Sequence, residues 1–589
     1  MMKTVLHSVL ESMVSADDQR PAIEEPGRTV THHEMHLAAN RIANGLASDF
    51  ALTKGDRVGL HLPVGVDYVT AALGVAKSGG VFVPLDLAAP PERQQAVLDI
   101  AAPKVVISDR SHELPAGIEH AELGRFASHS SASVPLAVTG DDPSYMVFTS
   151  GSTGTPKAIL GTHKGLSHFM HWEVGEFGLD GECRISQLAA PTFDVSLRDI
   201  FVPLLAGGTL CVPPDDARTN TRLLIEWLEA SRVSLMHCVP SLFRQVMAEL
   251  EDADTNAQSL AALSHVLLAG EPLYGTDVQR WRALVGSRIE LVNLYGPSET
   301  TLAKAFHRIE AEQAQGRRTV PVGKALPNSA LLIVKDDELC DEGEIGEVFI
   351  KTPFMTKGYV DAPELQAEAF VQNPLTSDVP DIVYRTGDMG RYLPDHVVEL
   401  LGRRDNQVKV NGIRIELGEV ESALMRHDEV ETAVVVAHQT PGQEPSLAAY
   451  YVGARPLETQ ALRTTLANWL PMAMHPAYFV QMDELPVNLH GKVNRRALPQ
   501  PADLLYQNTP YVAPSSATER TLSSLWGEVL ALDKVSVTHG FADLGGDSLK
   551  AIRLLSRVFQ DCGVEVPLQS LFPNGNIKTV AATIDATRG

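Results

Sequence analysis

Cysteine is scarce in this chain, and its few copies are far apart. The 589 residues include five Cys, at positions 183, 211, 238, 340 and 562, and no two of them form a C-x-x-C pair. An odd number of dispersed cysteines disfavours both a disulfide framework and a cysteine-based zinc site. We therefore expect the protein in a reducing compartment, the cytoplasm.

Positive charge and long apolar stretches are also limited. Lys and Arg number 49 against 73 Asp and Glu, a net charge of −24, which disfavours binding to nucleic acid or to anionic membranes. No apolar run approaches the roughly 18 residues of a membrane-spanning helix. The N-terminal stretch is interrupted by His7, Ser8 and Glu11, so it lacks the apolar core of a signal peptide. We expect neither a nucleic-acid nor a membrane partner.

Short apolar runs alternate with helix-length segments along the first half of the chain. The strand-like runs lie at 57–62, 104–108, 209–213, 234–239 and 265–270, and the helix-length segments at 66–78, 219–230 and 241–252. This alternation is typical of βαβ units and parallel sheets. The sequence therefore predicts the α/β fold class.

Changes in composition divide the rest of the chain, and its length suggests about four domains. Glycine-punctuated strands from about residue 320 predict a smaller, partly antiparallel subdomain, and residues 420–438 predict a helix followed by a strand. Residues 499–519 are rich in Pro, Ser and Ala, which is typical of a linker, and amphipathic helices follow. The predicted domains are a core at 1–404, an α+β lid at 405–499, a linker at 500–516 and a helical bundle at 517–589.

One stretch has an unusual concentration of small polar residues: TSGSTGTPK, residues 149–157. Its glycines let backbone NH groups converge, its hydroxyls add donors, and its lysine adds positive charge, which together suit a polyphosphate. The Walker pattern is not matched, so a P-loop NTPase is disfavoured. Taken alone, the stretch is more typical of a flexible surface loop, because clusters of Ser, Gly and Thr are common in loops.

Seven more motifs accompany this one in a fixed order. They are KSGGVFVPLD (77–86), FDVS (193–196), NLYGPSE (293–299), YRTGD (384–388), GRRDNQVKVNGIRIELGEVE (402–421), LPMAMHP (470–476) and HGKVNR (490–495). Together the eight motifs resemble the adenylation domains of non-ribosomal peptide synthetases, within the adenylate-forming family. LGGDSL (544–549) resembles the modification site of a peptidyl carrier protein. The resemblance covers nearly the whole chain.

The resemblance implies a fold and a reaction. The fold would be a large α/β core with a β-barrel-like subdomain, a small α+β lid and a four-helix-bundle carrier. The enzyme would activate an amino acid with ATP and Mg²⁺ as aminoacyl-AMP and pass it to a 4′-phosphopantetheine thiol on its own carrier.

The resemblance also implies the roles of residues at the nucleotide. Glu299 would bind Mg²⁺, Tyr295 would stack on adenine, Asn293 would contact its edge beside Gly296, and Asp388 would accept hydrogen bonds from the ribose with Arg403 nearby. An ionised Asp suits a diol because it only accepts hydrogen bonds. The phosphates would be bound by Thr149, Ser150, Gly151, Ser152, Thr153, Gly154 and Lys157.

Four further positions carry catalytic or covalent roles by the same resemblance: Lys492, Asp405, Lys409 and Ser548. Lys492 would lie between the substrate carboxylate and the α-phosphate. Asp405 would be the hinge about which the lid rotates, and this rotation would present the segment that starts at Lys409. Ser548 would carry the 4′-phosphopantetheine at a positively polarised helix end.

A few residues depart from the family pattern. His490 and Asn494 flank Lys492 where Asn and Asp are common, Ala158 replaces a usual Gly, and Ser298 replaces Thr. The first two affect how the lysine is positioned, and none suggests an inactive enzyme.

The substrate pocket is inferred by counting from these motifs. Asp194 matches the aspartate that binds a substrate ammonium, which implies an α-amino acid. Arg198 lies four residues later, on the same face if the segment is helical. Its guanidinium favours a carboxylate partner, which predicts an acidic substrate, unless Arg198 only pairs with Asp194 or Asp199 and the substrate is small and polar or neutral. The predicted lining is Phe193, Asp194, Val195, Arg198, His237, Leu267, Ala269, Leu294, Leu302, Ala303 and Lys492.

The partners follow from this interpretation. They are the amino acid, a phosphopantetheinyl transferase, a downstream condensation, tailoring or acceptor protein, and an MbtH-like helper. The chain is then a loading or tethering module, or a piece of a longer synthetase. The alternative function is a free-standing acyl-CoA or aryl-CoA synthetase of the same fold, against which Asp194 and the carrier argue. An inactive ligand-binding or scaffold protein is disfavoured because Lys492, Glu299, Asp388 and Ser548 are all present.

Overall fold

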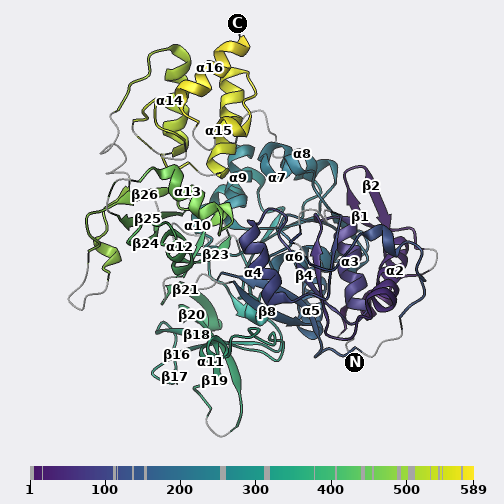
Figure 1. The fold of residues 1–589 in the computed structure, drawn as a ribbon. Coiled ribbons are helices and arrows are strands. Elements are labelled where there is room, and N and C mark those ends of the chain that lie inside the picture. The colour runs from purple at the N-terminus through teal and green to yellow at the C-terminus, as the bar shows by residue number, and fades with distance from the viewer. Residues whose placement is uncertain are drawn as a thin grey trace. The chain divides into compact units, whose positions relative to one another are not determined.

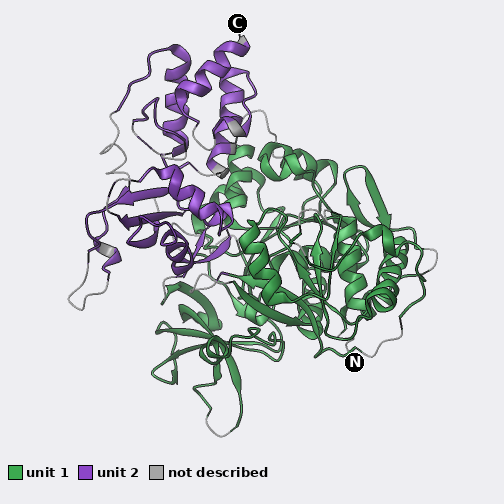
Figure 2. Cartoon of the chain, viewed as in Figure 1, with its two compact units in different colours: residues 1–149, 156–406 green, residues 150–155, 407–589 purple. Residues whose placement is uncertain are grey.

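The computed structural model describes most of the chain. The described residues are 5–588 without 16–17, 110–113, 116, 135–137, 151–155, 252–259, 311–318, 377–378, 405–406, 411, 439–444, 454, 456, 487–492, 502–510, 531, 533, 542–543, 547 and 572–574; at 496, 548, 549, 552, 569 and 588 the backbone alone is described. They form two compact units, shown in Figure 2: residues 1–149 with 156–406, and residues 150–155 with 407–589. The four predicted domains are a finer division and stay a prediction.

Figure 1 shows the ribbon of the chain with its labelled elements. The first unit contains a nine-stranded sheet whose central strands run parallel. Antiparallel strands complete both of its edges. In spatial order the strands are β15 (Lys324–Ala325), β14 (Ala305–Arg308), β13 (Glu290–Tyr295), β12 (His265–Ala269), β11 (Leu235–Cys238), β9 (Arg184–Ser186), β10 (Thr209–Cys211), β1 (Pro21–Glu25) and β2 (Arg28–Thr31).

A second, six-stranded sheet of this unit is parallel except for its last hairpin. Its order is β6 (His120–Ala121), β5 (Val105–Ser108), β3 (Arg57–His61), β4 (Val81–Pro84), β7 (Pro143–Thr149) and β8 (Lys157–Thr162). The two sheets confirm the α/β class, and the predicted strands in both lie within two residues of their expected bounds.

Helices pack against these sheets through their apolar faces. They are α1 (Leu6–Glu11), α2 (His32–Phe50), α3 (Val66–Lys77), α4 (Pro91–Ala101), α5 (His163–Glu176), α6 (Val195–Ala206), α7 (Asp215–Thr219), α8 (Thr221–Ala230), α9 (Pro240–Leu250) and α10 (Gly275–Val285). Local sequence explains their starts: Thr31 and Glu34 form a capping box before α2, and Pro240 occupies the first turn of α9, where its missing N–H costs nothing.

Two apolar clusters cover opposite faces of the nine-stranded sheet. Leu197, Ile200 and Phe201 of α6 belong to the cluster that includes Leu267 and Leu294. The cluster on the other face joins Val266 and Leu268 to residues of α8, α9 and α10. Buried on both faces, the strands consist of near-continuous apolar runs, as parallel strands usually do.

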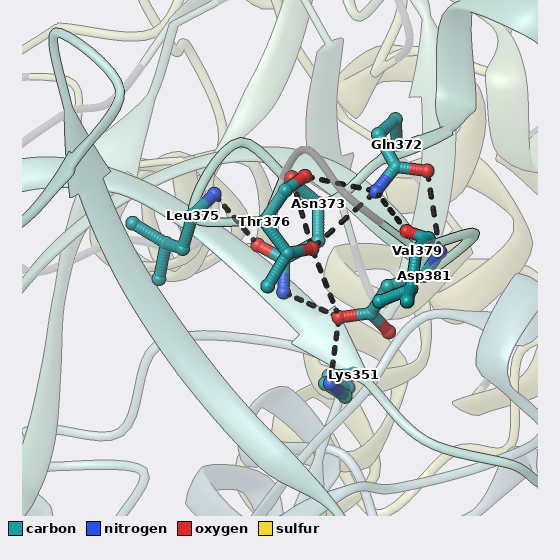
Figure 3. A network of polar contacts seen from close by, with 7 residues as sticks. All are labelled: Lys351, Gln372, Asn373, Leu375, Thr376, Val379 and Asp381. Atoms are coloured by element: carbon teal, nitrogen blue, oxygen red, sulfur yellow. Dashed lines mark hydrogen bonds and ion pairs between the residues drawn. The ribbon is translucent and has the colours of Figure 1, made fainter.

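The third sheet of the unit is antiparallel throughout. It contains β17 (Glu338–Leu339), β16 (Ala330–Lys335), β18 (Ile345–Lys351), β20 (Ile382–Leu393), β19 (Phe370–Gln372) and β21 (Val397–Arg403), with α11 (Pro363–Ala369) before β19. Figure 3 shows the polar contacts that fix the β19–β20 connection. The Asp381 carboxylate accepts from Lys351 Nζ (2.6 Å) and from Asn373 Nδ2 (2.8 Å).

The second unit contains a hairpin and a three-stranded sheet. The hairpin consists of β22 (Gln407–Val410) and β23 (Ile413–Glu416). The sheet consists of β24 (Thr432–His438), β25 (Ser446–Val452) and β26 (Tyr478–Gln481), with α12 (Leu417–Leu424) and α13 (Thr459–Ala467) sharing one apolar cluster with it. The predicted helix followed by a strand within 420–438 is confirmed as α12 and β24.

The C-terminal part of this unit is helical, as predicted. It contains α14 (Ala517–Leu530), α15 (Ser548–Cys562) and α16 (Ile577–Arg588), and the 3₁₀ turn Leu568–Ser570 lies between the last two. Their shared core includes Trp526, which packs edge-on against Phe541 with ring centroids 5.0 Å apart. In the described part of the chain, no helix combines the length and the apolarity needed to cross a bilayer.

The C-terminal core predicts a strong effect of one truncation. Trp526 is fully buried, so Trp526→Ala removes a large apolar side chain and costs about 3–5 kcal/mol. We expect amide hydrogen exchange in α14–α16 of the full chain to become at least about a hundred times faster. Phe559→Ala is the control because Phe559 is 52% exposed; equal acceleration in both variants contradicts the packing.

Candidate active site

Four residues of the predicted pocket lie on one face of the nine-stranded sheet. His237 of β11 pairs in register with Leu267 of β12, and Ala269 of β12 pairs with Leu294 of β13. Leu267 and Ala269 are two residues apart, and side chains two apart on a strand point to the same side. The backbone pairing therefore brings together positions that are up to 57 residues apart in the sequence.

Helix α6 supplies the charged residues on this side of the sheet. Asp194 precedes its first residue, and Arg198 lies in its first turns, so the expected helical i, i+4 spacing is confirmed. Phe193 and Val195 beside Asp194 are half-buried, whereas Asp194 and Arg198 are buried, at 8% and 4% exposure. The site is thus a buried pair of opposite charges beside an apolar sheet face.

Asp194 is an energetically costly carboxylate. Burial raises its pKa, and the negative charge of Glu299 adds to this effect, while a hydrogen bond from Ser298 and the positive charge of Arg198 oppose it. A further cation near Asp194 would favour the ionised form. The residue is therefore suited to bind an ammonium group.

The guanidinium of Arg198 is 5% exposed and lies 3.9 Å, through Nε, from Oδ1 of Asp199. That separation is too long for a hydrogen bond. Among the described residues, no side chain or backbone group hydrogen-bonds to this guanidinium, and its Nε is buried. Arg198 therefore has donors that only a weak ion pair satisfies.

The segment after Glu299 shapes the pocket through an unusual backbone. Thr301 and Leu302 have φ values of 64° and 58°, a left-handed conformation that is costly for residues other than glycine. Lys304, fully buried, donates from Nζ to the carbonyls of Thr301 and Ala303. Burial lowers the pKa of Lys304 to about 7, opposed by the charge of Asp194. This lysine holds the turn that carries Leu302 and Ala303.

Gly296 has no room for a side chain. A Cβ atom there would lie 2.3 Å from the Leu302 carbonyl oxygen and 2.7 Å from the Ala303 Cα. Glycine is therefore required for close packing between the end of β13 and the left-handed turn.

The residues predicted at the nucleotide converge from three strands. Tyr295 at the end of β13 donates its hydroxyl to Asp388 Oδ2 at 2.5 Å, and Arg403 Nη1 donates to Asp388 Oδ1 at 2.9 Å. Asp388 and Arg403 are paired across β20 and β21. The structure thus brings Tyr295, Asp388 and Arg403 together, while the Asn293 amide nitrogen donates to the backbone carbonyls of Val320 and Pro321.

Glu299 is held by residues that follow it by about sixty positions. It lies in the 3₁₀ turn Ser298–Thr300 and is 1% exposed. Tyr359 donates its hydroxyl to Glu299 Oε1 at 2.6 Å, and Thr356 donates to the Glu299 carbonyl through Oγ1 and through its backbone NH. These contacts fix the carboxylate beside the pocket strands.

The predicted phosphate loop connects two antiparallel strands. Thr149 at the end of β7 pairs with Lys157 at the start of β8. Gly151, Ser152, Thr153 and Gly154 lie outside the described residues. Ser150 belongs to the second unit, where its hydroxyl donates to the Arg414 carbonyl at 2.7 Å and accepts from the Glu416 NH at 3.2 Å.

The predicted catalytic residues are described only in part. Lys492 and Asp405 lie outside the described residues, as does His490. Lys409 lies on β22, paired with Arg414 of β23. Ser548 is the first residue of α15, and its side chain lies outside the described part.

Three residues that hold this site lie outside every sequence motif. Glu173 of α5 contacts His237, Tyr359 contacts Glu299, and Lys304 supports the left-handed turn. Glu173 and Tyr359 lie about 60 residues from their partners, and no motif contains them. Lys304 was discoverable in principle, because a lone lysine within the apolar run after YGPSE is unusual for a buried segment.

Family models match three consecutive parts of the chain. Residues 10–360, more than half of the chain, match the model described as AMP-binding enzyme. The chain belongs to the AMP-binding enzyme family. Residues 419–492 match the AMP-binding enzyme C-terminal domain, and residues 520–584 match the phosphopantetheine attachment site. This AMP-binding enzyme is therefore an adenylation domain followed by a carrier domain.

Relatives of this AMP-binding enzyme include two large synthases. Tyrocidine synthase 3 of Brevibacillus parabrevis is 34% identical over 99% of the chain, and surfactin synthase subunit 1 of Bacillus subtilis (strain 168) is 32% identical over 99%. The chain spans 9% and 16% of their lengths.

Solved structures share the fold. That of holo-PA1221, an NRPS protein containing adenylation and PCP domains, has a TM-score of 0.84 at 24% identity, covering 99% of this chain and 98% of that one. NpsA-ThdA, an artificially fused adenylation–PCP di-domain NRPS from Klebsiella oxytoca, has a TM-score of 0.72 at 24% identity, covering 99% of both chains. The resemblance inferred from the motifs and the predicted fold class are confirmed.

AMP-binding domains use ATP with Mg²⁺, and attachment domains carry phosphopantetheine, and the residues here fit these groups. Asp388 offers a carboxylate where Tyr295 and Arg403 converge, and Glu299 offers oxygen ligands of the kind Mg²⁺ prefers. Gly545, at φ 85°, precedes α15, whose fifteen residues start at Ser548. A helix start is favourable for a phosphate.

The ribose role of Asp388 is testable by one substitution. Asp388→Asn removes the charge that Arg403 and Tyr295 contact, and a hydrogen bond to a charged group is worth about 1.5–3 kcal/mol. We expect ATP to bind roughly 10 to 100 times more weakly by calorimetry. Asp395→Asn is the matched control, since Asp395 is exposed. An unchanged affinity in Asp388→Asn rules out the assigned role.

Proposed function

We propose that this chain activates an α-amino acid with ATP and loads it onto its own carrier domain. The supporting observation is that one chain contains an AMP-binding enzyme domain, its C-terminal domain and a phosphopantetheine attachment site in succession. A substrate carboxylate oxygen attacks the α-phosphorus of ATP, and the bond to pyrophosphate breaks. Aminoacyl-AMP is the product of this first step.

Residues of the chain neutralise charge during that step. Lys492 stabilises the negative oxygens of both the carboxylate and the α-phosphate, and residues 149–157 bind the phosphates, since such fixed donors act where charge develops. Glu299 would hold Mg²⁺, which would supply further positive charge. Ser548 would carry the phosphopantetheine, which would supply the thiol that takes the aminoacyl group from aminoacyl-AMP, with AMP as the leaving group.

Asp194 supports an amino acid as the substrate class. It is a buried carboxylate whose raised pKa reflects an apolar environment, and an ammonium group would compensate its charge. The apolar face formed by Leu267, Ala269 and Leu294 leaves Asp194 as the group that recognises the cation.

Arg198 supports an acidic side chain on that amino acid. A buried guanidinium with unsatisfied donors is costly, and a carboxylate is its best geometric partner. The alternative in which Arg198 only pairs with Asp194 or Asp199 is weakened by two observations. Arg198 Nε lies 3.9 Å from Asp199 Oδ1, and among the described residues no ion pair within 4.0 Å joins Arg198 to Asp194. We therefore propose a substrate of the aspartate, glutamate or aminoadipate type over a small neutral one.

A free-standing acyl-CoA or aryl-CoA synthetase is less well supported. Such an enzyme needs neither a carrier domain nor a carboxylate like Asp194 in its substrate pocket. The proposed reaction also implies partners: a phosphopantetheinyl transferase that modifies Ser548, a downstream condensation, tailoring or acceptor protein, and an MbtH-like helper. We propose the cytoplasm as the place of this reaction.

Two substitutions separate the two half-reactions. Lys492→Ala removes the bridging cation, and we expect amino-acid-dependent ATP–pyrophosphate exchange to fall about 10²–10³-fold. Ser548→Ala leaves exchange unchanged but abolishes loading, measured as the mass of the carrier after treatment with transferase, CoA, ATP and amino acid. Lys324→Ala, at an exposed lysine, is the control. Loading that persists in Ser548→Ala overturns the assigned attachment residue.

Arg198 determines the preferred substrate if the pocket assignment is right. We expect Arg198→Ala to lower kcat/KM for the preferred acidic amino acid about 10- to 100-fold, because the substrate carboxylate is left unpaired. Activity with neutral amino acids should not fall. Arg222→Ala serves as the control, since Arg222 pairs with Glu226 on α8. If the wild type prefers a neutral amino acid and Arg198→Ala keeps that preference, the acidic class is wrong.

A further inference from the structure

Four buried charged side chains contact one another in succession next to residues of the predicted substrate pocket; we call them the Glu173–Arg198 network. Glu173 comes from α5, His237 from β11, and Asp199 and Arg198 are consecutive on α6. Their side chains are 0%, 1%, 1% and 5% exposed. Charged groups are rarely buried to this degree unless they are paired. The loss of any one contact in the network would therefore leave a buried charge without its partner.

His237 is the central residue of the Glu173–Arg198 network. Its Nε2 lies 2.7 Å from Glu173 Oε1, and its Nδ1 lies 3.0 Å from Asp199 Oδ1. The first contact is a hydrogen bond, whereas the second is an ion-pair contact without hydrogen-bond geometry. Two ionised carboxylates on opposite sides of the ring favour the doubly protonated imidazolium. Burial by itself lowers the pKa of His237, but the charge of Glu173, with help from Asp199, outweighs burial and the repulsion from Arg198, and the pKa is raised.

The Asp199 carboxylate lies near two positively charged groups, the His237 ring and the Arg198 guanidinium. Its Oδ2 accepts from the backbone NH groups of Leu188 (3.2 Å) and Ala189 (3.1 Å), which fixes the carboxylate. Its Oδ1 faces His237 at 3.0 Å but Arg198 Nε at 3.9 Å. The imidazolium therefore holds the oxygen that would otherwise be the nearest partner of the guanidinium.

We propose that Glu173 is a positioning residue for substrate selection: by holding the imidazolium of His237 against Asp199, it prevents a close Asp199–Arg198 ion pair and keeps Arg198 available to an acidic substrate side chain. This inference rests on the proposed function of Arg198. Neither Glu173 nor Asp199 needs to touch the substrate, and His237 acts through its neighbours, because both of its nitrogens already face carboxylates.

Glu173→Gln tests the network at the residue that is farthest from Arg198 in the series of contacts. The loss of one anion lets His237 lose a proton and frees Asp199 to draw Arg198 into a direct pair. We expect KM for the acidic amino acid to rise about tenfold or more, with kcat within about twofold and neutral amino acids unaffected. Glu176→Gln is the matched control on the same helix, where Glu176 contacts Arg308. Equal losses for acidic and neutral amino acids overturn the proposal, because they indicate a merely structural role.

A double substitution separates positioning from damage to the core. In Glu173→Gln with Asp199→Asn the Asp199 carboxylate is no longer present to capture Arg198, while Asp194 is the same as in the wild type. We therefore expect KM for the acidic amino acid to return toward the wild-type value. A double variant no better than the single one contradicts the mechanism.

NMR titration of the His237 ring tests the network without measuring activity. The His237 resonance is assigned by its loss in His237→Gln. The charged groups that act on the ring are Glu173 from α5 and Arg198 and Asp199 from α6, and Arg218 of α7 acts on Asp199. We expect the ring to stay protonated to higher pH in the wild type than in Glu173→Gln. Equal titration midpoints in the two proteins would contradict the proposed effect of Glu173 on His237. If the wild type activates only neutral amino acids while the midpoints differ, the acidic substrate class fails and the role of Glu173 in selection fails with it, but His237 remains held by Glu173.

Discussion

The parallel backbone pairing of β11, β12 and β13 is the constraint on which the site depends. Because His237 aligns with Leu267 and Ala269 with Leu294, one sheet face presents a mostly apolar surface toward the cluster that includes α6. A shift of one residue in this register would turn all of these side chains to the opposite face. The cluster on that opposite face, built around Trp281 and Phe243, opposes such a shift, since every strand residue there is already buried.

Few charged side chains lie beside this apolar face, and each buried charge has an opposite charge nearby. Asp194 lies near Arg198 and Lys304, and His237 lies between two carboxylates. Buried charges contribute little to stability on balance, because desolvation offsets attraction. In the proposed function their value is selectivity: an amino acid would be recognised by the charges it completes, and a ligand lacking one of them would leave a protein charge unpaired.

A single short segment connects the nucleotide residues with the substrate pocket. Tyr295 reaches Asp388, while Gly296, one residue later, packs against the left-handed turn that carries Leu302 and Ala303. Lys304 donates to that turn, and its backbone NH bonds to the Tyr295 carbonyl at 2.7 Å. The side chains that we propose for the nucleotide and for the amino acid are therefore fixed by one stretch of backbone, whose strain is balanced by a buried lysine.

The sequence by itself determined the fold class, the order of the motifs and most of the strands and helices around them, because apolar periodicity and glycine-rich turns are local properties. It also predicted nucleotide and metal roles for Tyr295, Glu299, Asp388 and Arg403, since each lies within a recognisable motif. The structure brings Tyr295, Asp388 and Arg403 into contact. Only the tertiary structure revealed Glu173, Tyr359 and the position of Asp199 between two cations. Those contacts join residues on different elements, and such pairings are decided by how helices and strands pack, which no local pattern encodes.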